Sequence, residues 1–251
     1  MLMNNLQNKQ LFSILVDYVS HKFLKLCYFM VLGSFLISCG NDKSPKNSET
    51  LESGTKEVAD APTETKTNTI LFFGDSITAG YGLQSTDEAY PDLIQKKIDS
   101  LGFDYTVINS GVSGETTAGG KSRIDWILNQ DIAIFILELG ANDGLRGVTV
   151  SETQRNLQAI IDAVRAKNAS TEIILAGMEL PPNMGRDYTA EFRAVFSNLA
   201  ETNDVEFIPF ILKDVGGIAE LNQNDGIHPT AKGHSIIANT VWEYLEPLLK
   251  S

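Results

Sequence analysis

The chain has 251 residues and a formal net charge of −12, which already narrows the kinds of partner it can have. Basic and acidic residues balance over residues 1–68, so the whole negative charge falls in residues 69–251. Such an acidic region repels phosphate backbones, and we expect no nucleic-acid partner. Both cysteines precede residue 69, which excludes disulfides, thiolate catalysis and cysteine metal sites within 69–251. The histidines there are His228 and His234 alone, too few for a multi-histidine zinc centre, so we predict no metal.

The N-terminal segment combines lysines, a short apolar run and a cysteine. Lysines precede an uncharged run at residues 26–37. A helix that spans a membrane needs about 20 apolar residues, so this run is too short for one and better fits a signal peptide. Ser38 and Cys39 follow, and the site resembles the lipobox, where a peptidase cuts before a lipidated cysteine. We therefore expect residues 1–38 to be a signal peptide and a lipid on Cys39 to anchor the protein at a membrane of the cell envelope. The alternative is a short anchor helix that ends in an incidental cysteine.

The next segment is predicted to be a tether. Residues 40–68 consist mainly of Ser, Thr, Asn, Glu, Lys and Pro, with almost no large apolar side chains. Such a segment buries too little surface to offset the entropy of ordering it. We expect the lipidated Cys39 and a disordered linker over 39–68, followed by one domain at 69–251 that is long enough for a sizeable core.

Within that domain, short apolar runs alternate with helical patterns. The predicted buried strands are residues 70–73, 105–108, 132–137, 172–176 and 206–210. One helix is indicated by apolar residues at helical spacing, namely Leu157, Ile160, Ile161 and Val164. A capping box at Ser151 and Gln154 is predicted to begin it. The last helix is marked by Ile237, Val241, Tyr244, Leu245 and Leu248, and Pro247 is expected to disturb its final turn. This alternation predicts a parallel sheet covered on both faces, with functional sites outside the C-terminal ends of its strands.

A serine follows the first predicted strand, in Gly74-Asp75-Ser76-Ile77-Thr78. A serine at that place can point its hydroxyl into a cleft at the sheet's edge. Gly-Asp-Ser is a weak signal alone, because turns commonly use these residues, and a helix N-cap is the competing interpretation. The α/β-hydrolase elbow requires glycine where Thr78 stands, so that fold is not indicated.

Three further loops carry residues that suit the same chemistry. The second strand is followed by a glycine-rich loop around Gly114, which fails as a phosphate loop because Glu115 stands where a glycine is required. The third is followed by Asn142, whose amide can donate to an oxyanion. Near the end, Asp225 and His228 bring a carboxylate and an imidazole together, so that one ring nitrogen is held and the other faces a serine.

Taken in order, these four blocks resemble the SGNH (GDSL) hydrolase family over residues 70–249. Ile77 replaces the leucine of the GDSL signature. The strings at residues 138–147, 180–188 and 225–229 are similar to the bacterial arylesterase, acyl-CoA thioesterase I and lysophospholipase branch. The resemblance implies a three-layer α/β/α sandwich with a five-stranded parallel sheet, a flavodoxin-like arrangement.

The resemblance also implies a role for each site residue. Ser76 matches the family's nucleophile, His228 its general base, and Asp225 the carboxylate that orients the base. The implied oxyanion donors are the Ser76 and Gly114 backbone N–H groups and the Asn142 side chain. Outside these roles, we expect Asp75 and Asp143 to fix loops, and His234 to pack on the last helix.

The predicted reaction is hydrolysis of a small-molecule ester or thioester through an acyl-enzyme, and it requires no cofactor. We expect an apolar groove for the acyl chain, with Leu145, Val148, Leu180 and Met184 as candidate lining residues. One alternative is a carbohydrate or peptidoglycan O-acetylesterase. A second alternative is a non-catalytic lipoprotein that binds an acyl ligand, although an intact Ser76, Asp225 and His228 disfavour it.

Overall fold

Each apolar run of the domain forms a strand in the computed structural model, which describes residues 68–250. The strands are β1 (Asn68–Gly74), β2 (Tyr105–Gly111), β3 (Ile134–Glu138), β4 (Glu172–Ala176) and β5 (Glu206–Ile208). All five predicted strands are confirmed; the bounds of β4 are as predicted, and the other four strands have at least one shifted end. β1 begins at Asn68, which the sequence assigned to the linker, and β3 begins two residues later than expected. β5 stops before Pro209, because proline has no N–H to donate to the neighbouring strand.

The sheet is parallel throughout, in the order β2-β1-β3-β4-β5. The chain passes from β1 outward to β2 and then returns across β1 to β3, so the direction of winding reverses between β1 and β3. In sheets of this order, ligands bind at that reversal, just beyond the C-terminal ends of the two strands. The fold therefore predicts a site flanked by the residues after Gly74 and after Glu138.

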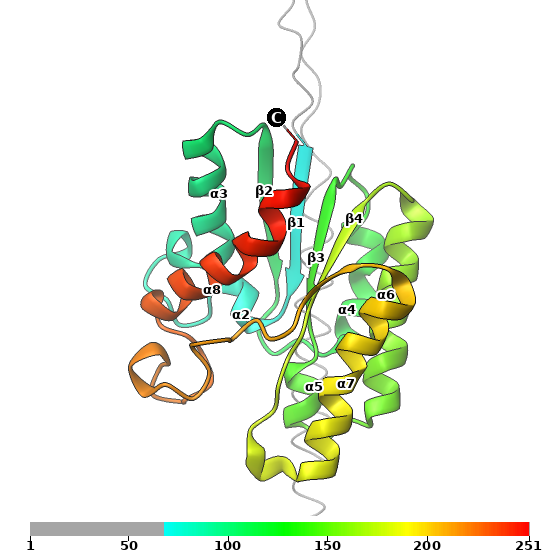
Figure 1. Ribbon diagram of the computed structural model, residues 1–251, viewed down its shortest axis with the longest axis vertical. Coiled ribbons are helices and arrows are strands. Elements are labelled where there is room, and N and C mark those ends of the chain that lie inside the picture. The colour runs from blue at the N-terminus through cyan, green and yellow to red at the C-terminus, as the bar shows by residue number, and fades with distance from the viewer. Residues whose placement is uncertain (1–67, 251) are drawn as a thin grey trace, which may run out of the picture. The chain divides into compact units, whose positions relative to one another are not determined.

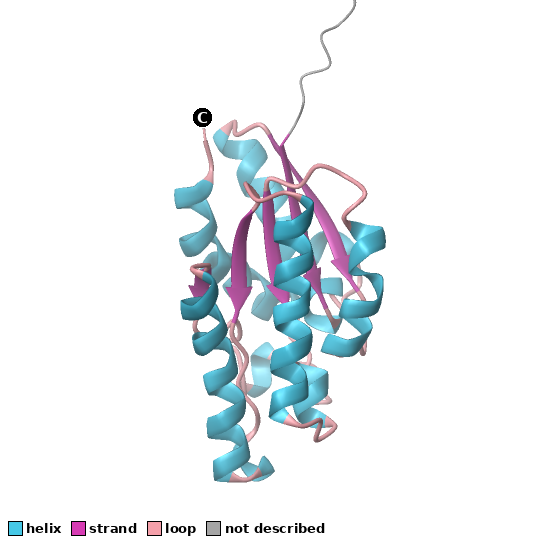
Figure 2. Ribbon diagram, turned by 90° about the vertical axis from the view of Figure 1, so that its right-hand side faces the viewer, coloured by secondary structure: helices cyan, strands magenta, loops and turns pink. Residues whose placement is uncertain are grey.

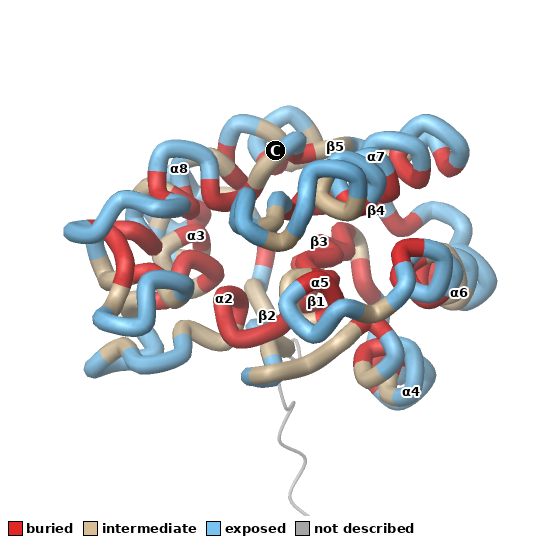
Figure 3. Tube along the Cα trace, turned by 90° about the horizontal axis from the view of Figure 1, so that it is seen from below, coloured by how far each residue is buried: buried red, intermediate tan, exposed pale blue. Residues whose placement is uncertain are grey.

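Helices cover both faces of the sheet. They are α2 (Ser76–Ala79), α3 (Tyr90–Leu101), α4 (Thr117–Ile127), α5 (Ala141–Leu145), α6 (Val150–Lys167), α7 (Arg186–Asn203) and α8 (Ala231–Leu245). The helices α3 and α8 lie on one face, while α4, α6 and α7 lie on the other (Figures 1 and 3). Figure 2, turned toward the second group, shows its helices standing in front of the strands. The predicted three-layer sandwich is confirmed.

The core fills the two spaces between the sheet and the helices. β1 and β3 are buried almost along their whole length, as strands covered on both faces must be. The residues Leu157, Ile160, Ile161 and Val164 form the buried stripe of α6, which confirms the helical periodicity. The last helix is also confirmed: α8 ends at Leu245, and a 3-10 turn at Glu246–Leu248 carries Pro247.

The predicted capping box at the start of α6 is wrong. The helix begins at Val150 after Thr149, so Ser151 and Gln154 lie inside its first turns. The backbone N–H groups of Glu152 and Thr153 both donate to the Thr149 carbonyl, which starts the helix earlier than Ser151 could. Val150 is buried in the core, and we attribute the earlier start to this burial.

The predictions for the N-terminal segment, including the signal peptide, Cys39 and all of the linker except Asn68, lie outside the described residues. Across residues 68–250, the structure has no helix that is both long enough and apolar enough to cross a membrane.

Candidate active site

Ser76 stands at the turn between β1 and α2, at the C-terminal edge of the sheet. Asp75 caps the short helix, because its Oδ1 accepts a hydrogen bond from the Ile77 N–H at 3.0 Å. Gly74 ends the strand, and Ser76 begins the helix with 8% of its surface exposed. The side chain is therefore nearly buried yet borders the main cavity.

His228 and Asp225 come from the loop before α8, and the His228 ring meets Ser76 across 152 positions of sequence. The His228 Nδ1 lies 2.7 Å from Asp225 Oδ2, and its Nε2 lies 2.9 Å from Ser76 Oγ. A carboxylate can only accept, so Nδ1 carries the proton and Nε2 presents a lone pair to the serine hydroxyl. Ser76 Oγ–H thus donates to His228, and His228 Nδ1–H donates to Asp225.

Asp225 is itself fixed by its own loop. Its Oδ1 accepts from the N–H groups of Ile227 at 3.0 Å and His228 at 3.1 Å. Gly226 between them has φ +76°, a conformation that side-chain-bearing residues rarely adopt. The hydrogen bonds from the His228 ring and from these two N–H groups lower the pKa of Asp225 to about 2, so it is ionised at neutral pH.

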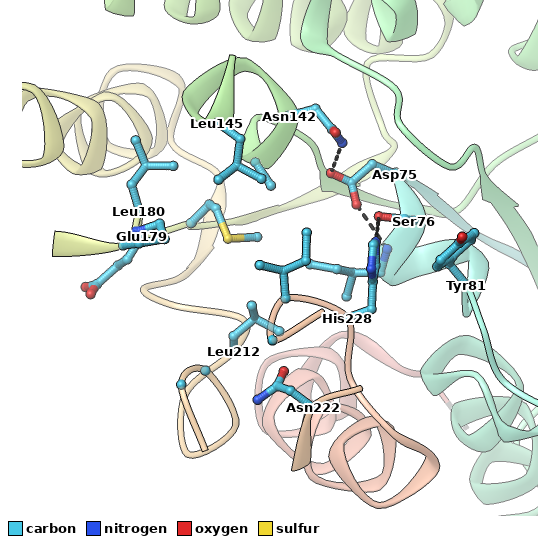
Figure 4. Close-up of a pocket in the computed structure, with 18 of the residues that line it drawn as sticks. Asp75, Ser76, Tyr81, Asn142, Leu145, Glu179, Leu180, Leu212, Asn222 and His228 are labelled. Atoms are coloured by element: carbon cyan, nitrogen blue, oxygen red, sulfur yellow. Dashed lines mark hydrogen bonds between the residues drawn. The ribbon is translucent and has the colours of Figure 1, made fainter. Parts of the chain in front are cut away.

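The other predicted residues of the site, Gly114 and Asn142, border the same cavity as Ser76. Figure 4 shows the Asn142 amide close to Asp75 and Ser76, with Nδ2 donating to Asp75 Oδ2 at 3.1 Å. An amide nitrogen carries two hydrogens, so the bond to Asp75 leaves one free for a ligand in the cleft. Gly114 has φ +78°, which its lack of a side chain permits.

Asp75 therefore caps its own helix and also positions Asn142, the candidate hydrogen-bond donor to the oxyanion. Burial raises the pKa of Asp75 to about 6, although the hydrogen bonds from Ile77 and Asn142 act in the opposite direction. At neutral pH it is largely ionised, and its charge holds the Asn142 amide.

The loops are tied together by polar contacts that the sequence did not reveal. Asp143 accepts from the Thr117 N–H at 2.8 Å and from the Thr117 hydroxyl, joining the third loop to the start of α4. Arg146 donates to the Gly114 carbonyl at 2.9 Å across the same gap. The predicted loop-fixing roles of Asp75 and Asp143 are thus seen: Asp75 fixes its own turn and also links it to the loop of Asn142, whereas Asp143 links its loop to the start of α4. Sequence offers no signal for such pairs, because their partners lie 67 and 26 positions away.

A cavity of about 630 Å³ opens beside Ser76 and His228. Its apolar wall includes Leu145, Met178, Leu180, Pro181, Pro182, Phe210, Leu212 and Ile227. Of the four predicted groove residues, Leu145 and Leu180 border it, whereas Val148 and Met184 do not. The backbone of Val148 is bound to Asp143 and to the Tyr188 hydroxyl at the far end of its loop, and Met184 ends a separate 3-10 turn.

Phe210 and Leu212 were missed because nothing in their local pattern distinguishes them from core residues. They follow β5, so the rule that sites lie beyond strand ends could have identified them. His234 lies buried on α8, as predicted. Among residues 68–250, no three His, Cys, Asp or Glu side chains are grouped as a metal site.

Comparison with known proteins agrees with this geometry. Residues 72–236 match the model of the GDSL-like Lipase/Acylhydrolase family. Esterase TesA of Pseudomonas aeruginosa is 39% identical over 182 residues, which cover 72% of this chain and 89% of the relative. Thioesterase 1/protease 1/lysophospholipase L1 of Escherichia coli is 37% identical over 183 residues, covering 72% and 85%.

Solved structures give the same result. A crystal structure of TesA superposes with a TM-score of 0.69 at 38% identity, covering 72% of this chain and all of the other. The esterase EstA from Pseudoalteromonas sp., inhibited by monoethylphosphonate, gives a TM-score of 0.68 at 35% identity, covering 72% and 97%. This chain therefore belongs to the GDSL-like lipase/acylhydrolase family and is a hydrolase of esters or thioesters.

Proposed function

We propose that the protein hydrolyses its ester or thioester substrate through an acyl-enzyme on Ser76. The observation that carries this proposal is the chain of two hydrogen bonds from Ser76 Oγ through the His228 ring to Asp225. His228 is placed to take the serine proton as Oγ attacks the carbonyl carbon, and Asp225 stabilises the imidazolium that forms.

The same residues serve both halves of the reaction. The tetrahedral oxyanion receives hydrogen bonds from the Ser76 and Gly114 backbone N–H groups and from the Asn142 side chain. His228 then protonates the leaving alkoxide or thiolate, which releases the first product. Water, deprotonated by His228, then attacks the carbonyl carbon of the acyl-enzyme. As the bond to Oγ breaks, the acid product leaves and His228 returns the proton to Ser76.

Substitution of the nucleophile tests this assignment. Ser76→Ala should lower kcat by several orders of magnitude, because the attacking atom is lost. A fluorophosphonate probe should label the wild-type protein at Ser76, as located by peptide mass mapping, and should leave the variant unlabelled. Labelling of a different serine would overturn the assignment.

For the substrate, we propose an acyl chain of roughly six carbons or more, since each buried methylene contributes about 0.8 kcal/mol. A cavity of about 630 Å³ with an apolar wall has room for such a chain. The names of the relatives, an esterase and a thioesterase/lysophospholipase, also suit acyl substrates. An acetylesterase pocket would close behind a methyl group.

A series of p-nitrophenyl esters from acetate to palmitate measures this preference, with acetylated xylan as the competing substrate. We expect kcat/KM to rise with chain length until the cavity is filled. A maximum at acetate, or faster release of acetate from xylan, would replace this proposal with the acetylesterase alternative and leave the Ser76 mechanism in place.

We further propose that the protein is a lipoprotein of the bacterial cell envelope, anchored through Cys39. The proposal is supported by the apolar run that follows two lysines and leads to Ser38 and Cys39. In a bacterial host fed radiolabelled palmitate, the wild-type protein should become labelled, and Cys39→Ala should remain an unlabelled, uncleaved precursor. Equal labelling of the two would refute the anchor.

A further inference from the structure

A carboxyl group with no cationic partner among residues 68–250 lies beneath the turn that carries Ser76. Glu138, the last residue of β3, is 1% exposed. Its Oε2 accepts hydrogen bonds from the Thr78 hydroxyl at 2.7 Å and from the Asp75 N–H at 3.3 Å. Its Oε1 has no hydrogen-bond partner among the described residues. The reaction described above does not use this group.

The groups around Glu138 favour its neutral form. Asp75 faces it from the turn after β1, and the Tyr90 hydroxyl of α3 approaches through Thr78, while His234 of α8 stacks behind Tyr90. Burial and the nearby Asp75 carboxylate raise the pKa of Glu138 well above its ordinary value. Burial also lowers the pKa of His234 to about 4, so no cation approaches from that side at neutral pH. Of the two carboxyls, Asp75 therefore carries the charge and Glu138 carries the proton.

The two donors to Glu138 lie on either side of the nucleophile. Asp75 immediately precedes Ser76, and Thr78 follows it by two positions. Since the Thr78 hydroxyl donates to Glu138, the Tyr90 hydroxyl at 2.8 Å donates in turn to Thr78. The contact also explains Gly74, where an added Cβ would lie 2.1 Å from Thr78 Oγ1 and 2.6 Å from Glu138 Oε2.

We infer that Glu138 is a positioning residue for the reaction, in which its neutral carboxyl fastens the turn on both sides of Ser76. The Ser76 hydroxyl is thereby held 2.9 Å from His228 Nε2. A charged group at this place would put a second anion beside Asp75 and disturb the same turn. The inference rests on the proposed role of Ser76 as nucleophile, which fluorophosphonate labelling of the wild-type protein tests separately.

The decisive comparison is between two substitutions of Glu138. In Glu138→Gln, the amide oxygen can accept both hydrogen bonds without a charge, so kcat and the rate of fluorophosphonate labelling should stay close to wild type. In Glu138→Ala, both bonds are lost, and kcat should fall roughly tenfold to a hundredfold with a smaller change in KM. The matched control is Ile134→Ala, a buried substitution at the other end of β3, which should lower Tm without lowering kcat.

Two results would overturn the inference. If Glu138→Ala loses Tm as the control does but keeps its kcat, the residue is only structural. If Glu138→Gln is as impaired as Glu138→Ala, the site needs an ionised carboxylate. The infrared spectrum gives a direct check, since the carbonyl stretch of a buried protonated acid should be present in the wild type and absent from Glu138→Gln.

Thr78 supplies a second test should Glu138→Ala fail to fold. Thr78→Ser keeps the hydroxyl that donates to Glu138, and its kcat should resemble that of the wild type. Thr78→Val keeps the shape and removes the donor, so kcat should fall roughly tenfold. Equal kcat values for these two variants would contradict the inference, whatever their Tm.

Discussion

Asp225 keeps His228 in one tautomer although the Asp225 side chain is 41% exposed. Three accepted hydrogen bonds hold the Asp225 carboxylate in place despite this exposure. The same bonds lower the pKa of Asp225 from 3.8 to about 2. The carboxylate therefore stays ionised until the pH falls toward that value. Loss of activity in mild acid will have another origin than the titration of Asp225.

Asp225→Asn tests the tautomer argument. The asparagine amide can turn its NH₂ group toward His228, which favours the tautomer with the proton on Nε2 and removes the acceptor for the Ser76 proton. We expect kcat to fall by roughly 10⁴, with little change in KM for a p-nitrophenyl ester. A variant that retains most of its kcat would show that the loop backbone alone orients the ring.

The role of the Asn142 side chain in catalysis can be tested separately from its role in stability. Asn142→Ala should lower kcat by roughly 10²–10³, the usual effect of removing one oxyanion donor. Thermal stability should change little, because Asn142 and Asp75 both border the cavity, where water can replace the amide as the donor to Asp75 Oδ2. A large loss of Tm with unchanged kcat would instead make Asn142 a structural link between the two loops.

The helix α8 brings an acid-sensitive group into the core. His234 is fully buried, its Nδ1 accepts from the Tyr90 N–H at 3.2 Å, and burial lowers its pKa from 6.5 to about 4. In the unfolded chain, His234 binds a proton more readily than it does in the folded protein. The contribution of neutral His234 to the free energy of unfolding is therefore complete above pH 6.5 and declines as the pH falls toward 4. Asp75, whose pKa is raised to about 6, acts in the opposite direction over part of this range.

The contribution of His234 can be isolated by difference. His234→Asn keeps an acceptor for the Tyr90 N–H but does not titrate, and it leaves Asp75 in place. The Tm advantage of the wild type over this variant should therefore be largest near pH 7 and should shrink as the pH falls through 6.5 toward 4. A difference that is constant with pH would show that His234 is not protonated on unfolding in this range.

The strands and the four site blocks were predictable from sequence because each depends on local pattern. Apolar runs defined the strands, and the site residues follow β1, β2 and β3 or precede α8. The pairs that join these blocks were not predictable, since Asp75–Asn142 and Asp143–Thr117 depend on the parallel pairing of strands distant in sequence. The predicted start of α6 failed for a related reason: the burial of Val150 outweighed the local capping signal at Ser151.

The acidity of residues 69–251 should distinguish two classes of acyl substrate. The formal net charge of −12 repels an acyl-CoA, whose leaving group carries phosphates, and has no such effect on a neutral ester. Raising the salt concentration from about 0.01 M to about 0.1 M shortens the screening length from about 30 Å to about 10 Å, which weakens the repulsion.

We therefore expect kcat/KM for octanoyl-CoA to rise several-fold over this salt range, while kcat/KM for p-nitrophenyl octanoate stays nearly constant. The neutral ester carries the same acyl chain, so it controls for any effect of salt on the acyl cavity or on the Ser76–His228 pair. A neutral thioester, such as the octanoyl ester of a simple alkyl thiol, separates the charge of the leaving group from its sulfur and should behave like the p-nitrophenyl ester. A fall in kcat/KM for octanoyl-CoA with added salt would mean that local cations near the cavity, such as Arg146, outweigh the net charge and attract the phosphates.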